Sequence, residues 1–439
     1  MANVLNNGMK ETELGSLPED WDVVRLSEIA KLTSGGTPSK KRLDFWEGPI
    51  PWASPKDLKR PRLLDTEDHI SQAGLDDGSR LVPAGSLFVV VRGMILSKDL
   101  PVAMAMVPMA FNQDMKAICP GDRIDGDFLL QAFTAYKRRL APEIGTSAHG
   151  TRRISTSSIE DFLVPLPPLP EQRAIALVLR TVQRAKEATE KAIAATRTLK
   201  QSLMRHLFTY GPVPFDQADQ VELKETAIGA VPSDWKDKTL GDCARLATGG
   251  TPDRRNSEYW NGGIPWVKTG EINYSVIRST EETISEAGLN NSNARPFPIG
   301  TLLVAMYGQG VTRGRVARLG IEATTNQACA AIFPCDGVDT DFLYHYFVHN
   351  YQRIREMGHG ANQRNLSMTM LKTVKLHIPP FPEQRTIASL LSPLDTKLQN
   401  ARARVSALDA LFTSLLHSLM IGKVRVNDLD LAESIGGNS

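Results

Sequence analysis

The hydrophobic pattern of the chain is most regular between residues 387 and 419. Apolar or small side chains recur there at alternating steps of four and three residues, over about five heptads. They are Ile387, Leu391, Leu394, Leu398, Ala401, Val405, Leu408, Phe412, Leu415 and Leu419. This spacing forms one stripe along a helix, as in a coiled coil. We therefore predict a long helix over about residues 382–421 that packs against another helix.

A second stripe with the same spacing is more polar. It carries Ile175, Leu179, Val182, Lys186, Thr189, Ile193, Thr196, Lys200, Leu203 and Leu207, and we expect Ala185, Ala192 and Leu199 to widen it. The predicted helix covers about residues 170–208. Each helix of roughly 40 residues is about 60 Å long at 1.5 Å per residue. We expect the two helices to pair antiparallel and to act as a rigid spacer.

The remaining segments are rich in turns and short apolar runs. Residues 87–91 and 302–306 are apolar and follow Pro-x-Gly turns, which is typical of buried strands. Residues 127–133 and 341–347 predict short amphipathic helices, each opening with an Asp that suits the first turn. These elements indicate an α+β fold.

The chain repeats itself at long range. Four segments return in the same order: Leu14–Trp21 as Ile228–Trp235, Ser34–Pro38 as Thr248–Pro252, Phe45–Trp52 as Tyr259–Trp266, and Pro167–Arg173 as Pro379–Arg385. The offset falls only from 214 (235 − 21) to 212 (384 − 172). A repeat of this length is a whole domain with its connector, used twice.

The repeat predicts two similar mixed α/β domains, separated by two long helices in an antiparallel coiled coil with a pseudo-twofold internal repeat. The expected boundaries are 1–165 for the first mixed domain, 166–210 for the central helix, 211–227 for a linker, 228–377 for the second mixed domain, 378–422 for the distal helix and 423–439 for a tail. Gly211, Pro212 and Pro214 argue against regular structure in the linker.

Composition narrows the function only a little. The formal net charge is +2, so a nucleic-acid surface on this chain must be a local concentration of positive charge. The four cysteines show no metal-ligand spacing, and we expect buried, reduced thiols. The start has no basic segment followed by an apolar one, and no apolar run approaches the roughly 20 residues of a membrane span. We therefore expect a cytoplasmic protein.

The Gly-Gly-Thr-Pro turns, the Ile-Pro-Trp segments and the Pro-Glu-Gln-Arg starts of both helices, each present twice and in order, resemble the specificity subunit of type I restriction-modification enzymes. The resemblance covers nearly the whole chain. It implies two target-recognition domains, each reading one half of a bipartite double-stranded DNA site, and no catalysis by this subunit.

The same resemblance implies partners in a heteromultimer. The helices would recruit two modification subunits, which bind S-adenosylmethionine and methylate an adenine in each half-site, and restriction subunits, which use ATP and Mg. This chain would hold no cofactor or metal itself. The expected partner-binding residues are Glu171, Gln172, Arg173, Glu383, Gln384 and Arg385.

Catalytic motifs of such a system are missing from the sequence. The nearest approach to the Asn/Asp-Pro-Pro-Tyr/Phe loop of an adenine methyltransferase is residues 378–381, where Ile378 offers no acceptor. There is no P-loop, and Arg313 stands where a dinucleotide-binding turn starting at Gly308 would need its third glycine. Two alternatives remain: a protein-interaction scaffold that binds peptides or glycans, and a methyltransferase with an unrecognised site.

Residues identical in both copies are expected to be framework, because two half-sites differ. All six tryptophans form such pairs: 21/235, 46/260 and 52/266. The Gly35-Gly36 and Gly249-Gly250 pairs predict turns with positive φ, the alternative being close approach to a phosphate. Asn112-Gln113 and Asn326-Gln327 fit internal hydrogen bonding, although such amides can also bind adenine.

Base-reading residues are expected where the copies diverge. Three basic or amide-bearing stretches do so: 39–42 against 253–256, 92–98 against 307–315, and 148–153 against 359–364. For any single residue there, plain solvated surface is an equal alternative. The candidate DNA-binding residues are Lys40, Lys41, Arg42, Arg92, Lys98, Arg152, Arg153, Arg254, Arg255, Tyr307, Gln309, Arg313, Arg315, Gln363 and Arg364.

Overall fold

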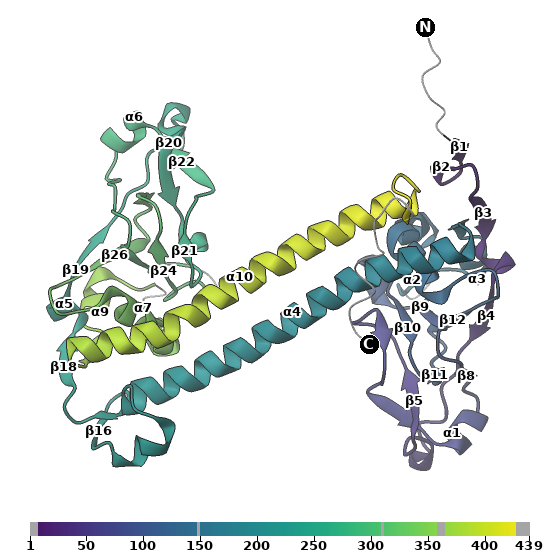
Figure 1. The fold of residues 1–439 in the computed structure, drawn as a ribbon, viewed down its shortest axis with the longest axis horizontal. Helices are drawn as coiled ribbons and strands as arrows, with labels where there is room; N and C mark the ends of the chain where they lie inside the picture. Colours follow the sequence, from purple (N-terminus) through teal and green to yellow (C-terminus); the bar gives the residue numbers. More distant parts are fainter. Residues whose placement is uncertain (1–7, 147–149, 309–310, 358–364, 427–439) are drawn as a thin grey trace, which may run out of the picture. The chain divides into compact units, whose positions relative to one another are not determined.

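The computed structural model describes residues 8–146, 150–308, 311–357 and 365–426 (Figure 1). The chain divides into two compact units, residues 1–188 with 405–439 (unit 1) and residues 189–404 (unit 2). Both boundaries cut through the long helices α4 (Leu169–Tyr210) and α10 (Phe381–Met420). Each unit therefore contains one mixed domain and about half of each long helix.

Unit 1 is built on a five-stranded sheet of order β4-β12-β9-β10-β6: Ala30–Ser34, Met115–Pro120, Leu87–Val90, Val102–Ala105 and Arg62–Leu63. A smaller sheet has the order β7-β5-β11-β8: Asp68–Ile70, Ile50–Ala53, Met109–Phe111 and Leu81–Val82. Three strand pairs complete it: β1 (Met9–Thr12) with β2 (Gly15–Pro18), β3 (Asp22–Arg25) with β15 (Leu163–Leu166), and β13 (Gly145–Thr146) with β14 (Arg152–Arg153). The short helices are α1 (Gln72–Asp76), α2 (Gly126–Tyr136) and α3 (Thr156–Glu160).

Unit 2 repeats this plan. Its five-stranded sheet has the order β19-β26-β23-β24-β21: Ala244–Thr248, Cys329–Pro334, Leu302–Ala305, Val316–Leu319 and Val276–Ile277. Its smaller sheet has the order β22-β20-β25: Glu282–Ile284, Trp260–Val267 and Thr324–Thr325. Two strand pairs, β16 (Leu223–Thr226) with β17 (Gly229–Pro232) and β18 (Lys236–Thr239) with β27 (Lys375–Ile378), flank them. The helices are α5 (Leu240–Cys243), α6 (Glu286–Asn290), α7 (Thr340–His349), α8 (Tyr351–Glu356) and α9 (Met368–Lys372). The matching strand orders confirm two similar mixed domains.

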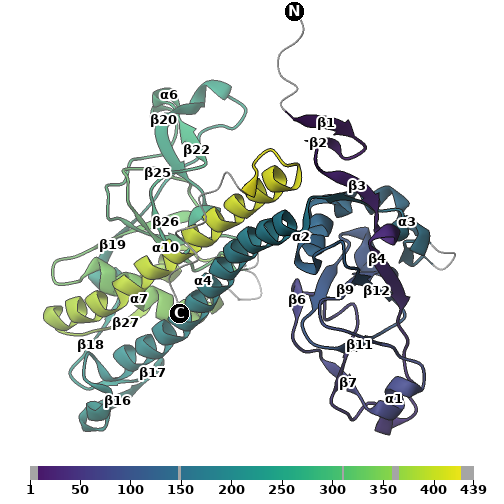
Figure 2. The same ribbon diagram turned by 45° about the vertical axis from the view of Figure 1, so that its right-hand side comes forward.

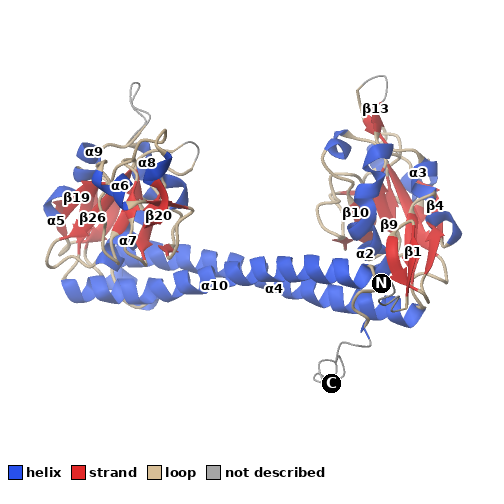
Figure 3. Ribbon diagram, turned by 90° about the horizontal axis from the view of Figure 1, so that it is seen from above, coloured by secondary structure: helices blue, strands red, loops and turns tan. Residues whose placement is uncertain are grey.

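Within each unit the smaller sheet lies at one end and a buried helix at the other. In unit 1, α1, β5 and β7 lie at the opposite end from α2 (Figures 1 and 2). Asp125 caps the N-terminus of α2, because its side chain accepts a hydrogen bond from the Phe128 N–H. Its apolar face, including Phe128 and Phe133, is fully buried in the core of unit 1. Helix α2 also lies beside α4, where Gln131 Nε2 donates a hydrogen bond to Gln183 Oε1 (Figure 3).

The glutamine of each Pro-Glu-Gln-Arg segment locks the long helix to its own domain. The Gln172 side chain accepts a hydrogen bond from Asp125 N at 2.8 Å and donates to the Arg123 and Pro167 carbonyls. Gln384 makes the equivalent bonds to Asp339 N and to the Gly337 and Pro379 carbonyls. Both side chains are buried, so the two glutamines that we expected to bind a partner do not lie on the surface. They satisfy backbone groups at the start of α2 and α7 instead.

The predicted stripes follow the burial pattern of both long helices. Every one of the ten positions in each stripe is buried or half-buried, including the polar Thr189, Thr196 and Lys200 of α4. Ala192 and Leu199 are exposed, so they do not widen the stripe as expected. In unit 1 the Lys186 ammonium binds the Asp409 carboxylate at 2.6 Å, and in unit 2 Lys200 pairs with Asp395. In each unit, therefore, α4 and α10 are linked by an ion pair on this stripe.

Two expectations from composition need correction. The interval 211–227 is not free of regular structure, because residues 223–226 form β16, which pairs with β17. Pro212 and Pro214 restrict only the residues beside them.

The four cysteines are all free thiols, but Cys335 is exposed rather than buried as expected. Cys329 is buried, and its burial raises the pKa of the thiol.

A buried histidine faces the Lys200–Asp395 pair in unit 2. His345 on α7 is fully buried and its Nε2 lies 3.1 Å from the Ser392 hydroxyl. Its Nδ1 lies 3.7 Å from Asp395 Oδ2. Burial, and then the nearby charges of Lys200 and Arg318, lower the pKa of His345 well below 6.5. The folded protein therefore holds this imidazole neutral.

Replacing His345 should make stability less dependent on pH. The pKa of His345 is lower in the folded state than in the unfolded state, so its contribution is complete above pH 6.5 and is lost as the pH falls below it. Gln131 occupies the equivalent position in unit 1 (131 + 214 = 345), so His345→Gln suits the fold. The free energy of unfolding of the wild type should fall more steeply than that of the variant, by about 1.4 kcal/mol per pH unit below 6.5.

Urea unfolding from about pH 7.5 to about pH 5.5 measures this difference. The control is His417→Gln, which removes an exposed histidine of α10 and keeps His345. Parallel curves for the wild type and His345→Gln would contradict the neutral, buried state of His345.

Candidate nucleic-acid interface

In each domain, several loops meet where the five-stranded sheet adjoins the smaller one. The antiparallel register places Ser34, Val90 and Met115 at this end of the unit 1 sheet. Thr248, Ala305 and Cys329 occupy the corresponding places in unit 2. We call this the junction end of each sheet. The Gly-Gly-Thr-Pro segment and the loop after β9 or β23 both leave from it.

The paired glycines pack against backbone at the junction end. A Cβ on Gly35 would lie 2.2 Å from the Asn112 carbonyl oxygen, and one on Gly36 would lie 1.7 Å from that of Gly78. In unit 2, a Cβ on Gly249 would lie 1.9 Å from the Thr325 oxygen, and one on Gly250 would lie 2.4 Å from Asn293 C. None of the four has a positive φ. The prediction of a positive-φ turn is therefore wrong, and close packing is what excludes a side chain.

The paired tryptophans are framework, as predicted. Trp52 Nε1 donates to the Gly36 carbonyl at 3.0 Å, and Trp266 Nε1 donates to that of Gly250 at 2.9 Å. The Trp46/Trp52 and Trp260/Trp266 rings pack edge to face, with centroids 4.9 and 5.1 Å apart. Trp21 and Trp235 are buried in the cores of their units. Each glycine turn is therefore held by an indole from its own smaller sheet.

The Asn-Gln pairs make hydrogen bonds to the residues just before β12 and β26 and to the glycine segments. Asn112 Oδ1 accepts from Asp114 N, and Asn326 Oδ1 accepts from Ala328 N, both at 3.1 Å. The following glutamine behaves differently: the Thr37 hydroxyl donates to Gln113 Oε1, and the Thr251 hydroxyl donates to Gln327 Oε1. The asparagines are thus internal framework, whereas each glutamine keeps its amide nitrogen available.

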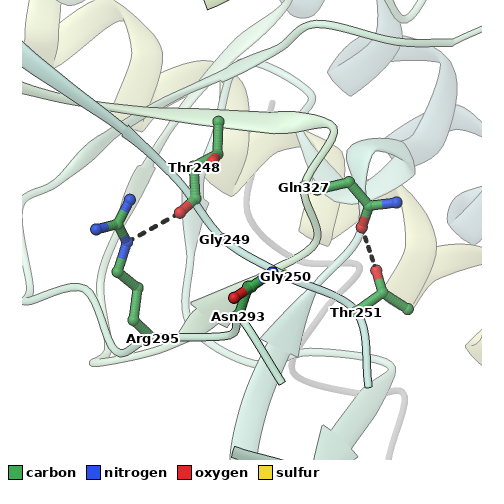
Figure 4. Close-up of a pocket in the computed structure, with 7 residues that line it drawn as sticks. All are labelled: Thr248, Gly249, Gly250, Thr251, Asn293, Arg295 and Gln327. Atoms are coloured by element: carbon green, nitrogen blue, oxygen red, sulfur yellow. Dashed lines mark hydrogen bonds between the residues drawn. The ribbon is translucent and has the colours of Figure 1, made fainter. Parts of the chain in front are cut away.

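A cleft of about 540 Å³ opens beside the glycine segment of unit 2 (Figure 4). Its lining residues are Thr248, Gly249, Gly250, Thr251, Asn293, Arg295 and Gln327. Arg295 Nε donates to the Thr248 carbonyl at 2.9 Å, and Figure 4 shows its guanidinium on the opposite side of the glycines from Gln327. The lining contains one cation and no carboxylate. It is therefore suited to a group that accepts hydrogen bonds.

Two of the divergent stretches of unit 1 meet at the junction end. Arg92 and Arg153 form an antiparallel backbone bridge, and Gly93 N donates to the Arg152 carbonyl at 3.0 Å. The Arg92 guanidinium lies 3.6 Å from Asp114 and is largely exposed. Lys98 and Arg152 line a second cleft of about 340 Å³, together with Lys137, Arg138 and others. The predicted residues Arg92, Lys98, Arg152 and Arg153 therefore lie in one basic region.

In the corresponding loop of unit 2, residues 307–315, only some of the candidate DNA-binding side chains are exposed to solvent. Tyr307 is exposed, but Arg313 is buried at 7% exposure, so its side chain does not lie on the surface with the other candidates. Arg315 is half-buried, donates to Asn273 Oδ1 at 2.9 Å and lies over the Tyr274 ring. Gln309, Gln363 and Arg364 lie outside the described residues.

The third pair of stretches lies beside the smaller sheets. Lys40, Lys41 and Arg42 are exposed, and Arg42 pairs with Asp44. Arg254 instead lies over the Trp260 ring, 3.7 Å from its centroid, and pairs with Glu282. The neighbouring Arg255 has 90% of its side chain exposed. Its hydrogen bonds lower the pKa of Asp253 to about 2. Of the two arginines, Arg255 is the more available to a ligand.

Three cations of this region were missed from the sequence. Arg295 lines the cleft, and Arg80 is its counterpart, because Val82 pairs with Met109 as Phe297 pairs with Ala323. One inserted residue raises the local offset to 215 (295 − 80), which hides the match at the main offset of 214. Lys116 Nζ donates to Ser34 Oγ at 2.6 Å. A register-aware alignment of the two copies is the signal that would have found the arginine pair.

The remaining partner-binding candidates lie at the starts of α4 and α10. Arg173 and Arg385 are exposed. Glu171 accepts from Trp21 Nε1 at 3.0 Å and from Arg425 Nε at 2.6 Å, so it is engaged within unit 1. Glu383 is half-buried, and burial raises the pKa of its carboxyl group. The two arginines are thus the most accessible members of the set.

Adding one methyl group at the glycine segment should destabilise unit 2. In Gly250→Ala the new Cβ would meet the backbone of Asn293 and Ala294, which have no flexible end to move. Such overpacking costs about 1–3 kcal/mol. Gly263→Ala is the matched control, because its Cβ would have no neighbour within 4 Å. Chemical unfolding should give Gly250→Ala a clearly lower free energy of unfolding than the control. Equal free energies of unfolding would contradict the role of close packing.

Among the described residues, no helix is long and apolar enough to cross a membrane. The described part of the chain also holds no cluster of three or more His, Cys, Asp or Glu side chains that could bind a metal ion.

Comparisons with known proteins agree with the duplicated plan. A family model described as the type I restriction modification DNA specificity domain matches residues 18–196 and 232–406. The MjaIX specificity subunit of a type I restriction enzyme from Methanocaldococcus jannaschii is 25% identical over 435 residues, 96% of this chain and 97% of that protein. The EcoR124I/EcoR124II specificity subunit from Escherichia coli is 37% identical over 156 residues, 35% of this chain and 39% of that protein.

The fold has a solved counterpart. The crystal structure of the S subunit of a type I restriction-modification system from M. genitalium matches with a TM-score of 0.66 at 17% identity, covering 95% of this chain and 98% of that one. The two family matches coincide with the two mixed domains and the helical segments that follow them. The chain therefore belongs to the family of type I restriction-modification specificity subunits and carries two copies of its DNA specificity domain.

Proposed function

We propose that this protein is the non-catalytic subunit that selects the DNA sequence for a type I restriction-modification complex, with each mixed domain reading one half of a bipartite site. The observation that carries the proposal is the distribution of differences between the two copies. Glycines, tryptophans and amides that build the junction end are shared, whereas the basic loops beside it differ. Two different base sequences require different contacts to base edges on a common scaffold.

The long helices would set the distance between the two half-sites. We infer one continuous antiparallel coiled coil, with the two domains related by a pseudo-twofold axis. The ion pairs support it: Lys186 and Lys200 are 14 residues apart, and so are their partners Asp409 and Asp395. Helices about 60 Å long limit the half-site centres to about 17 base pairs at 3.4 Å each. The two domains would then read opposite strands.

The partners follow from the same proposal. Two modification subunits would dock on the helical regions, with Arg173 and Arg385 as accessible contacts. S-adenosylmethionine would be bound by those subunits, and ATP and Mg by the restriction subunits. Exposed leucines at matched places on the outer surface, Leu199 on α4 and Leu411 on α10 (offset 212), add apolar area to this docking surface.

Mapping of methylated adenines tests the proposal. The chain is co-expressed with its modification subunits in a host without other adenine methylation. A split motif with a fixed gap is expected. If the chain is instead a scaffold for peptides or glycans, no methylated motif and no salt-sensitive DNA binding are expected. The absence of a motif, or of salt-sensitive DNA binding, would therefore reject DNA selection by this chain.

Exchange of one domain tests the independence of the two halves. Replacing residues 1–160 by those of a relative should change one half of the methylated motif and leave the other half and the gap unchanged. The control exchanges residues 228–377 and should change only the other half. If both halves change in either exchange, the domains do not read DNA independently.

A further inference from the structure

Five of the seven residues that line the cleft beside the glycine segment are identical in the two copies. In unit 2 these are Gly249, Gly250, Thr251, Arg295 and Gln327. We propose that the residues of this cleft, and their counterparts in unit 1, bind the phosphate backbone of the DNA, at the same place in both half-sites. The proposal rests on the DNA-recognition function above and deepens it, because it assigns sequence-independent contacts to residues that the base-reading loops do not include.

The donors of the cleft point to an anion. The Thr251 hydroxyl donates to Gln327 Oε1, which leaves the amide nitrogen of Gln327 for a ligand, on the side away from the Arg295 guanidinium (Figure 4). Arg295 uses Nε on the Thr248 carbonyl, which leaves the terminal nitrogens of its guanidinium for a ligand. With no carboxylate in the lining, the cleft offers a positive charge and several donors. Phosphate oxygens match both properties.

The first copy holds the same parts. The Thr37 hydroxyl donates to Gln113 Oε1, and Arg80 stands at the position of Arg295. Lys116 adds a second cation at Ser34, the residue before Gly35. A contact that both domains make must recognise something that two different half-sites have in common. Any two DNA sequences share the sugar-phosphate backbone, whereas they differ at base edges.

The cleft lies directly beside the base-reading loop. Gln113 belongs to the cleft, and the next residue, Asp114, accepts backbone hydrogen bonds from Val91 and Arg92 at 2.8 and 3.2 Å. In unit 2, Gln327 precedes Ala328, whose carbonyl accepts from Met306 N at 2.8 Å. Contact between the cleft residues and the DNA backbone would therefore set the register of the adjacent loop on the bases. This is the positioning role that phosphate contacts play in DNA recognition.

A change of one amide to a carboxylate tests the proposal. Gln327→Glu keeps an oxygen for the Thr251 hydroxyl, so the cleft retains its internal hydrogen bond, but the new charge would repel a phosphate. In the complex with modification subunits, binding of a cognate duplex should weaken by about tenfold or more. Binding of a random duplex should weaken by the same factor, and the methylated motif should not change. Gln113→Glu should behave in the same way.

Two further variants separate the phosphate contact from general charge. Gln217→Glu adds the same charge at an exposed position of unit 2 outside the cleft and should leave DNA affinity nearly unchanged. Arg295→Gln removes the cation at an exposed position, so folding should be preserved. The slope of log affinity against log salt should fall by about one for Arg295→Gln, and by about two when Arg80→Gln is added.

Three results would overturn the assignment. An altered base in the methylated motif of Gln327→Glu or Arg295→Gln would show that the cleft reads bases. Unchanged affinity and unchanged salt slope in folded Arg295→Gln would show that the cleft does not meet DNA. If Gln327→Glu and Gln217→Glu lose the same amount of DNA affinity, the loss would come from the change in net charge and not from the cleft. Failure of the proposed function is distinguishable, because the wild-type complex itself would then show no split motif.

Discussion

The close packing of backbone on backbone at the Gly-Gly-Thr-Pro segments is the constraint on which the rest of each domain depends. A Cβ at Gly36 or Gly250 would overlap the backbone of the turn that follows α1 or α6. The carbonyl of the same glycine accepts a buried indole N–H, so the segment is held from both sides. Because the segment also ends β4 or β19, it joins the two sheets of its domain. The glycine segment therefore also positions the loops at the junction end of the sheet.

Sharing and divergence between the copies then have a physical meaning. The backbone packing at the Gly-Gly-Thr-Pro segments leaves almost no room for other side chains, so both copies have the same glycines, tryptophans and amides there. The adjacent loops differ between the copies, although the Arg92–Arg153 bridge joins two of them in unit 1. A similar division holds for the long helices. Lys200 and Asp395 form a charged pair under His345, whereas unit 1 has Gln131 near Gln183 in the equivalent place. The helix segments of the two units are therefore chemically different at these equivalent places.

Much of this architecture could be predicted from the sequence, for reasons that particular residues show. Burial follows a periodic pattern, so all ten stripe positions of α10 were found from spacing alone. Identity between copies shows that a residue is needed but not why. Gln172 was therefore assigned to a partner although it satisfies backbone groups of its own domain, and Gly36 was assigned a positive φ although it lacks room for a Cβ. Arg313 was assigned to DNA because charge in a loop does not report burial. Arg80 and Arg295 were missed because an inserted residue shifts their offset.

The central claim is that the junction end of each sheet is the surface that meets DNA. Amide hydrogen exchange of the complex with modification subunits, with and without a cognate duplex, tests it most directly. Protection is predicted in the segments after β4 and β9 of unit 1 and after β19 and β23 of unit 2, including Gly36 and Gly250. The opposite end of each sheet, including the turns at Gly121 and Gly300, should exchange at the same rate in both samples. Protection of those turns, with no change at the glycine segments, would contradict the claim.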